Sequence, residues 1–129
     1  MKSHLKTHTP VESISSLSRY LQEIGRTPLL TAQEEQSLAS RIQKGDHLAR
    51  SRMLLANLRL VVSVAKKYVP GNDPELLMDL IQEGNIGLMR AVDRFRGEFK
   101  TRFSTYGVYW IRQAVLRALK ARRLVRLPE

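Results

Sequence analysis

The chain contains no cysteine and, outside its first nine residues, only one histidine, His47. Without cysteine, neither disulfides nor thiolate metal sites can form, which fits a reducing compartment. The sequence also lacks a phosphate-binding glycine loop, and its carboxylates fall on predicted surfaces rather than in an apolar pocket. We therefore expect a protein that is not an enzyme and that uses neither a cofactor nor a metal.

Long apolar runs are missing as well. No stretch approaches the roughly eighteen apolar residues of a membrane span, and the N-terminus lacks the apolar segment of a signal peptide. We therefore expect a cytoplasmic protein with no membrane partner. Its 129 residues, 43% of them hydrophobic, are enough for one domain with a substantial core.

Aromatic residues are few and unevenly placed, since six of the eight lie between Phe95 and Trp110. Charge is concentrated in the same part of the chain. Residues 90–126 hold eleven Lys and Arg against two acids, whereas residues 1–89 hold eleven against nine. Cations neutralise phosphates, and each exposed base can stack on a ring at roughly 1–3 kcal/mol. The C-terminal third therefore predicts a surface for single-stranded nucleic acid.

Apolar residues recur at helical spacing, and no stretch alternates as a strand does. The predicted fold is all-α, a compact helical domain of about five helices. We place them at about residues 13–24, 31–44, 46–69, 74–94 and 104–122, with the first beginning between residues 10 and 13. Thr31 with Glu34 forms a capping box, Asp46 and Asp73 are N-cap candidates, and the last helix can be capped by Ser104.

The last predicted helix divides into two faces at 100° per residue. An aliphatic face suits the core and consists of Val108, Ile111, Val115 and Leu119. The opposite face carries Tyr106, Tyr109, Trp110, Gln113 and Arg117, which favours contact with bases. For Trp110 alone, packing beneath a neighbouring helix is an equally good interpretation.

Gly84 and Gly87 lie inside a predicted helix, where each costs about 1 kcal/mol relative to alanine. Something must therefore approach the backbone closely there. One explanation is tight packing within the bundle. The other is an acidic docking face for another protein, formed by Asp79, Gln82, Glu83 and Asn85. The residue pattern alone favours neither.

Four stretches carry a family resemblance: DLIQEGNIGLMRAV (79–92), FSTY with WIRQA (103–106 and 110–114), ANLRLVVSVAKKY (56–68) and RYLQEIGRTPLLTAQEE (19–35). Together they resemble the signature of bacterial sigma factors of the sigma-70 family, in its housekeeping and related stress-type groups. The resemblance implies region 1.2-like helices over 13–45 and an all-helical sigma region 2 over 46–129. We expect a flexible tail over residues 1–12, because residues 1–9 are polar and basic without helical periodicity.

The resemblance implies a role in transcription initiation, with a location at the nucleoid in the bacterial cytoplasm. Such a domain binds the clamp helices of the β′ subunit of core RNA polymerase. It opens the promoter minus-ten element by capturing flipped bases of the non-template strand, and an anti-sigma factor is a further implied partner. The positions that match polymerase-docking residues are Asp79, Gln82, Glu83, Asn85 and Met89.

The resemblance also implies DNA contacts. Tyr106 matches the ring that stacks on a flipped adenine at minus eleven, with Phe95 in the same pocket. Asn57, Arg59 and Leu60 match residues around a second flipped base at minus seven. Gln113 matches a reader of the upstream end of the element, Arg112 and Arg117 match basic residues near the backbone, and Leu21 and Gln22 fall near the discriminator strand. The remaining implied DNA contacts are Lys100, Arg102, Phe103, Ser104, Thr105, Tyr109, Trp110 and Leu116.

The chain departs from the family pattern at Arg96, Thr101, Tyr109 and Leu116, where an acid, an aromatic, a tryptophan and a polar residue are usual. Fewer rings and more charge predict weaker promoter opening and stronger salt dependence than in a housekeeping relative. One alternative is a truncated sigma-like module that occupies the clamp helices without efficient opening. A double-stranded DNA regulator fits less well, because the bulky aromatic stripe suits major-groove base edges poorly.

Overall fold

The computed structural model describes residues 10–125, and the side chains of residues 16–122. The described residues form only helices: α1 (Pro10–Ile24), α2 (Ala32–Gln43), α3 (His47–Ala56), α4 (Leu58–Lys66), α5 (Pro74–Arg94), the 3-10 turn η2 (Gly97–Phe99) and α6 (Phe103–Val125). The all-α prediction is confirmed. Residues 1–9 of the predicted flexible tail lie outside the described residues, and residues 10–12 belong to α1 rather than to the tail.

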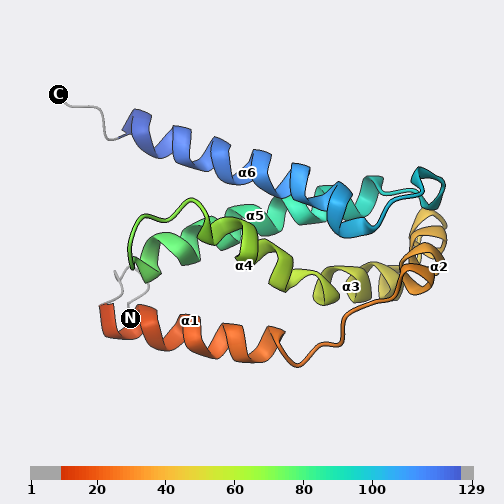
Figure 1. Ribbon diagram of the computed structural model, residues 1–129, viewed down its shortest axis with the longest axis horizontal. Helices are drawn as coiled ribbons and strands as arrows, with labels where there is room; N and C mark the ends of the chain where they lie inside the picture. The colour runs from red at the N-terminus through yellow and green to blue at the C-terminus, as the bar shows by residue number, and fades with distance from the viewer. Residues whose placement is uncertain (1–9, 126–129) are drawn as a thin grey trace.

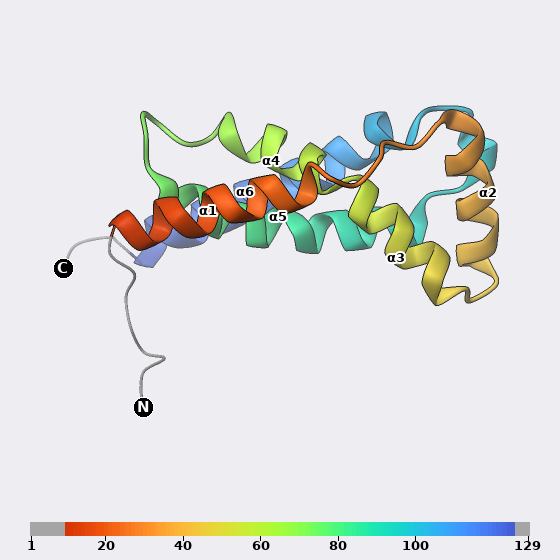
Figure 2. The ribbon, with the colours of Figure 1, turned by 90° about the horizontal axis from the view of Figure 1, so that it is seen from below.

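The helices form an elongated bundle (Figure 1). Helices α1, α5 and α6 run along its long axis, and α2 lies across one end (Figures 1 and 2). The most extensive packing is between α5 and α6, and α4 contacts both of them. Among residues 10–125, no helix is both long and apolar enough to cross a bilayer.

Three of the four predicted N-caps, Thr31, Asp46 and Asp73, are confirmed. Thr31 and Glu34 make both bonds of the capping box: the Thr31 hydroxyl accepts from the Glu34 N–H at 3.1 Å, and the Glu34 carboxylate accepts from the Thr31 N–H at 2.8 Å. Asp46 and Asp73 each accept from the N–H three residues further on, at 3.1 Å. Hydrogen bonds from backbone N–H groups lower the pKa of Glu34 and of Asp46 below the ordinary values.

The single helix predicted over residues 46–69 is wrong, because it breaks at Asn57 into α3 and α4. Asn57 has φ −116° and ψ 11°, outside the helical region. Its side-chain Nδ2 donates to the Met53 carbonyl at 2.9 Å, and its own carbonyl accepts from the Leu60 N–H at 3.1 Å. The amide thus satisfies backbone groups that the break would otherwise leave without partners. The predicted number of about five helices holds if α3 and α4 count as one interrupted helix.

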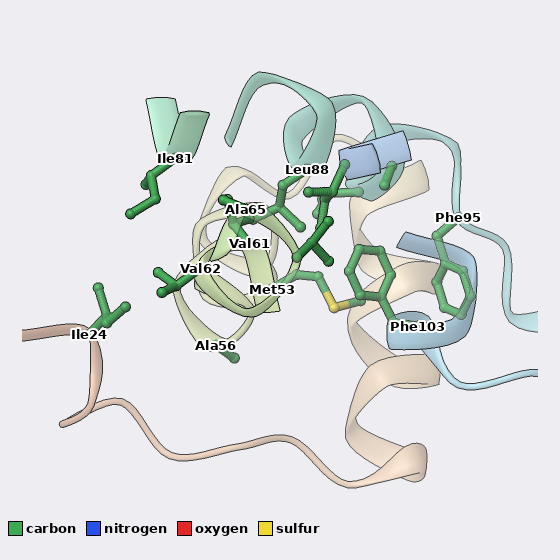
Figure 3. Packing of buried hydrophobic residues seen from close by; sticks show 14 of the residues in the cluster. Ile24, Met53, Ala56, Val61, Val62, Ala65, Ile81, Leu88, Phe95 and Phe103 are labelled. Atoms are coloured by element: carbon green, nitrogen blue, oxygen red, sulfur yellow. The ribbon is translucent and has the colours of Figure 1, made fainter. Parts of the chain in front are cut away.

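The last helix begins at Phe103, one residue before the predicted cap Ser104, and extends to Val125 rather than ending near Arg122. Its predicted core face is confirmed: Ile111 and Val115 are fully buried, and Val108 and Leu119 pack against the core. The core continues toward the α2 end of the bundle, where Met53 points at the ring of Phe103 beside Phe95 (Figure 3).

Close packing between helices explains the two glycines of α5. A Cβ on Gly87 would lie 2.5 Å from the carbonyl oxygen of Trp110, and one on Gly84 would lie 2.8 Å from Val61 Cγ1. Real Cβ atoms do not approach other heavy atoms so closely. The first explanation from the sequence is therefore confirmed: the glycines let α4 and α6 approach α5. They say nothing about an external partner.

Candidate nucleic-acid interface

The aromatic stripe of α6 reaches the surface. Tyr109 is exposed, and Tyr106 and Trp110 are half-buried. The ring of Trp110 lies 6.3 Å from that of Tyr106 and 5.8 Å from that of Tyr109, centroid to centroid. The Arg94 guanidinium lies 5.0 Å from the centroid of Trp110, a cation–π distance. Three adjoining rings with a cation against them can offer bases a stacking surface.

Two other predicted DNA contacts, Phe95 and Phe103, lie in the core instead. They are 1% and 0% exposed, and their rings meet edge to face at 5.3 Å. The ring of Phe95 lies 5.6 Å from that of Tyr106. The predicted direct contact of these two rings with DNA is therefore corrected: both are buried, Phe95 supports Tyr106 from the core, and Phe103 packs against Phe95. The apolar rings of phenylalanine have no polar atom to keep at the surface, so they are the ones that can be buried completely.

Arg102, another predicted DNA contact, is held by Glu35. Its Nε and Nη2 donate to the two Glu35 carboxylate oxygens at 3.0 and 3.1 Å, and Nη2 also donates to the Leu30 carbonyl at 3.0 Å. These hydrogen bonds raise the pKa of Arg102 above its ordinary value. The guanidinium remains half exposed, so it can still face a phosphate.

Glu35 was not predicted, although it is the buried acid of the site. Besides binding Arg102, its carboxylate accepts from the Phe103 N–H at 3.0 Å and so caps the start of α6. We call Glu35, Arg102 and the Phe103 N–H the Glu35 latch. The sequence gives only a weak signal for it, an acid in the first turn of α2, because the latch joins residues 67 positions apart.

A pocket of about 380 Å³ lies beside this latch. It gathers two groups of predicted DNA contacts that are distant in sequence: Asn57, Arg59 and Leu60 on one side, and Arg102 and Ser104 on the other. Leu29, Leu30, Glu35 and Ala56 complete its lining. Arg59 is oriented by a bond from Nη2 to the Thr27 carbonyl at 2.9 Å. The pocket can hold a planar group between apolar and hydrogen-bonding side chains.

The other predicted DNA contacts divide by exposure. Lys100, Thr105, Arg112, Leu116, Arg117 and Gln22 are exposed. Gln113 is half-buried, and Leu21 packs against the core. Phe99 was not among the predicted contacts, yet it is exposed and its ring lies 5.3 Å from that of Tyr106. Its place among six clustered aromatics was the available signal.

The predicted docking residues Asp79, Gln82 and Glu83 are exposed on α5 and line a groove of about 730 Å³ between α5 and α6. Its other charged residues are basic: Arg90, Arg117 and Arg122. Arg122 Nη1 donates to Asp79 Oδ2 at 3.1 Å across the groove. The structure therefore places the acidic residues in a groove of mixed charge rather than on a purely acidic face.

The last two predicted docking residues lie outside this groove lining. Met89 is partly exposed. Asn85 is half-buried toward α1, where its Nδ2 donates to the Tyr20 hydroxyl at 3.4 Å, so it does not share the surface expected for it.

Comparisons with known proteins match nearly the whole described chain. Residues 53–125 match the family model for sigma-70 region 2, and residues 15–48 match the model for sigma-70 factor region 1.2. Over 110 residues the chain is 54% identical to the RNA polymerase sigma factor SigA of Listeria monocytogenes serovar 1/2a. That alignment covers 84% of this chain and 29% of the relative, so the chain spans less than a third of the relative's length.

Proposed function

Because the chain belongs to the sigma-70 family of RNA polymerase sigma factors, we propose that it binds core polymerase and captures unstacked bases of the promoter minus-ten element. The observation that carries this proposal is the aromatic stripe of α6, which is exposed at Tyr109 and contacts the buried ring of Phe95 through Tyr106. A surface of rings fixed on a rigid core suits flipped bases.

Base capture follows from an energy balance. Removing a base from the duplex stack costs a few kcal/mol, and stacking it on a ring regains roughly 1–3 kcal/mol. We assign one flipped base to the ring of Tyr106, and the family resemblance implies that this base is the adenine at minus eleven. The pocket at Asn57, Arg59 and Leu60 suits the second base, at minus seven. Selection of a sequence in this way needs no covalent chemistry, so the proposed role is not enzymatic.

The backbone of the non-template strand would be held by the basic residues around these two sites. Lys100, Arg112 and Arg117 are exposed and carry the charge that neutralises phosphates. Gln113, half-buried beside them, is the proposed reader of the upstream end of the element.

The polymerase would bind on α5, at the groove that holds Asp79, Gln82 and Glu83. The proposed partner is the pair of clamp helices of β′, as the family resemblance implies. Asp79 is already paired with Arg122, so docking must compete with an intramolecular bond. Asn85 would act indirectly, through its bond to Tyr20 on α1.

The test measures retention of labelled single-stranded oligonucleotides by core polymerase saturated with this protein. We expect the non-template minus-ten strand to be retained better than its complement. Tyr106→Ala should weaken retention by about tenfold or more, because it removes one stack, whereas Tyr106→Phe, which keeps the ring, serves as the matched control. Equal retention of both strands would refute base-specific capture. Polymerase binding without any retention would instead favour the interaction module.

A further inference from the structure

Phe99 is a large apolar side chain that remains 44% exposed, directly before the exposed Lys100. Its ring centroid lies 5.3 Å from that of Tyr106, with the planes at 41°, and 5.9 Å from that of Phe95, edge to face. Both separations fall in the range of favourable ring contacts, 4.5–7 Å. The exposed part of Phe99 therefore continues the aromatic surface beyond α6 onto the preceding loop.

The loop that carries Phe99 is held in place. The Phe99 N–H donates to the Arg96 carbonyl at 3.1 Å within η2, and η2 packs against α2. The next residue, Lys100, has φ 56° in the left-handed region, although it is not a glycine. Such a conformation costs on the order of 1 kcal/mol and persists only where the surroundings enforce it. The ring is thus presented at a defined place beside Tyr106.

We propose that Phe99 is a second stacking ring of the base site at Tyr106, an inference that rests on the proposed function. A base stacked on Tyr106 lies within reach of Phe99, because the two rings are themselves in contact. Lys100 follows directly and places a cation where the phosphate of that nucleotide can be neutralised.

Phe99 also changes the number of rings available to bases. The sequence predicted a shortage of rings because Thr101 stands where the family usually has an aromatic. Phe99, two positions earlier, supplies a ring next to Tyr106 from the 3-10 turn. We therefore expect the base site to hold a flipped base against two adjoining protein rings despite Thr101.

The experiment measures the dissociation constant of the non-template minus-ten oligonucleotide from core polymerase saturated with wild-type protein or a variant. Phe99→Leu keeps apolar bulk and removes the ring, and we expect it to raise the dissociation constant about fivefold or more. Phe99→Tyr keeps the ring and should stay within about twofold of wild type. A second oligonucleotide, abasic at the adenine assigned to Tyr106, should show no difference between Phe99→Leu and wild type.

Each outcome separates this inference from the proposed function. If Tyr106→Ala weakens binding but Phe99→Leu does not, only the role of Phe99 is wrong. If neither variant changes binding of an oligonucleotide that the wild type retains, or if the wild type retains none, the proposed function fails as well. An equal loss on the abasic oligonucleotide would show that Phe99 holds the strand without stacking. Weaker binding of Phe99→Leu to polymerase itself, without DNA, would make Phe99 a protein contact. Either result would overturn the inference.

Discussion

Among the described residues, one ion pair holds α6 near each end. We call Glu35–Arg102 the buried tether and Asp79–Arg122 the exposed tether, because the two pairs differ in burial. Near its start, the Glu35 carboxylate is only 6% exposed, holds Arg102 through two hydrogen bonds and also caps the helix. Toward its end, Arg122 makes one hydrogen bond of 3.1 Å to Asp79, and the two side chains are 42% and 57% exposed.

This difference in burial matches the two functions proposed for the neighbouring surfaces: base capture near the start of α6 and polymerase docking near its end. Breaking a buried pair by removing one partner is costly, whereas exposed pairs contribute about 0–1 kcal/mol and are screened by salt. The rings and the 380 Å³ pocket lie at the buried tether, where their positions are fixed. The proposed docking residues lie at the exposed tether, where an incoming partner would replace Arg122 at little cost.

The largest expected effect comes from the segment between the tethers, where α6 contacts α5 at Gly87. Gly87→Ala would place a Cβ 2.5 Å from the Trp110 carbonyl, a backbone atom that cannot rotate away. We expect a loss of about 3 kcal/mol in the free energy of unfolding, at the upper end of overpacking costs, measured by urea denaturation. Gly97→Ala is the control, because the nearest side chain to its added Cβ would be Gln36, at an ordinary contact distance of 3.9 Å. Similar urea midpoints for the two variants would show that α6 shifts freely along α5. The start of α6 would then not be held more firmly than its end.

The next effect tests the buried tether. Glu35→Ala removes the ion pair and the cap of α6, and we expect it to lower the free energy of unfolding by about 1–3 kcal/mol. Arg102 is half exposed and regains water, which keeps the loss below that of a fully buried pair. Glu35→Gln, which can still accept the Phe103 N–H, should lose less. Gln33→Ala, at an exposed position of the same helix, serves as the control.

The same variants separate stability from position. At a temperature where Glu35→Ala is fully folded, core polymerase loaded with it should retain the minus-ten oligonucleotide more weakly than wild type, because the start of α6 and the pocket wall are no longer fixed. Unchanged retention by the folded variant would mean that the Glu35 latch contributes stability alone.

Local chemistry explains which parts of this molecule could be predicted from the sequence. The caps Thr31, Asp46 and Asp73 act on backbone groups three residues away, so their patterns were sufficient. The break at Asn57 was missed because no proline or glycine marks it. There the asparagine side chain donates to one carbonyl that loses its helical partner, while α3 packs on α2, α4 packs on α6 and both contact α5.

For the candidate site, the sequence predicted which residue types gather in one part of the chain, but not how their side chains are arranged. Clustering of rings and cations predicted a surface in the C-terminal third of the chain, and Phe99 and Tyr109 of that third are exposed. It could not show that Phe95 and Phe103 turn inward while Phe99 stays exposed, because that depends on how the loop after α5 packs against α2. The Glu35 latch depends on the same long-range packing, and no local pattern could reveal it.

The smallest expected effect concerns the exposed tether. Arg122→Ala should change the free energy of unfolding by less than about 0.5 kcal/mol, since the pair is exposed on both sides. Its effect on polymerase binding should be easier to detect. Freeing the Asp79 carboxylate removes a competitor of the proposed docking contact, so we expect affinity for core polymerase to rise about twofold at 50 mM salt. At 500 mM salt the difference should largely vanish, because the Debye length is then only about 4 Å. Lys120→Ala is the matched control, since it removes the same charge from an exposed position two residues away. Weaker polymerase binding by Arg122→Ala but not by Lys120→Ala would mean that Arg122 itself contacts the partner. The groove would then bind polymerase through basic as well as acidic side chains.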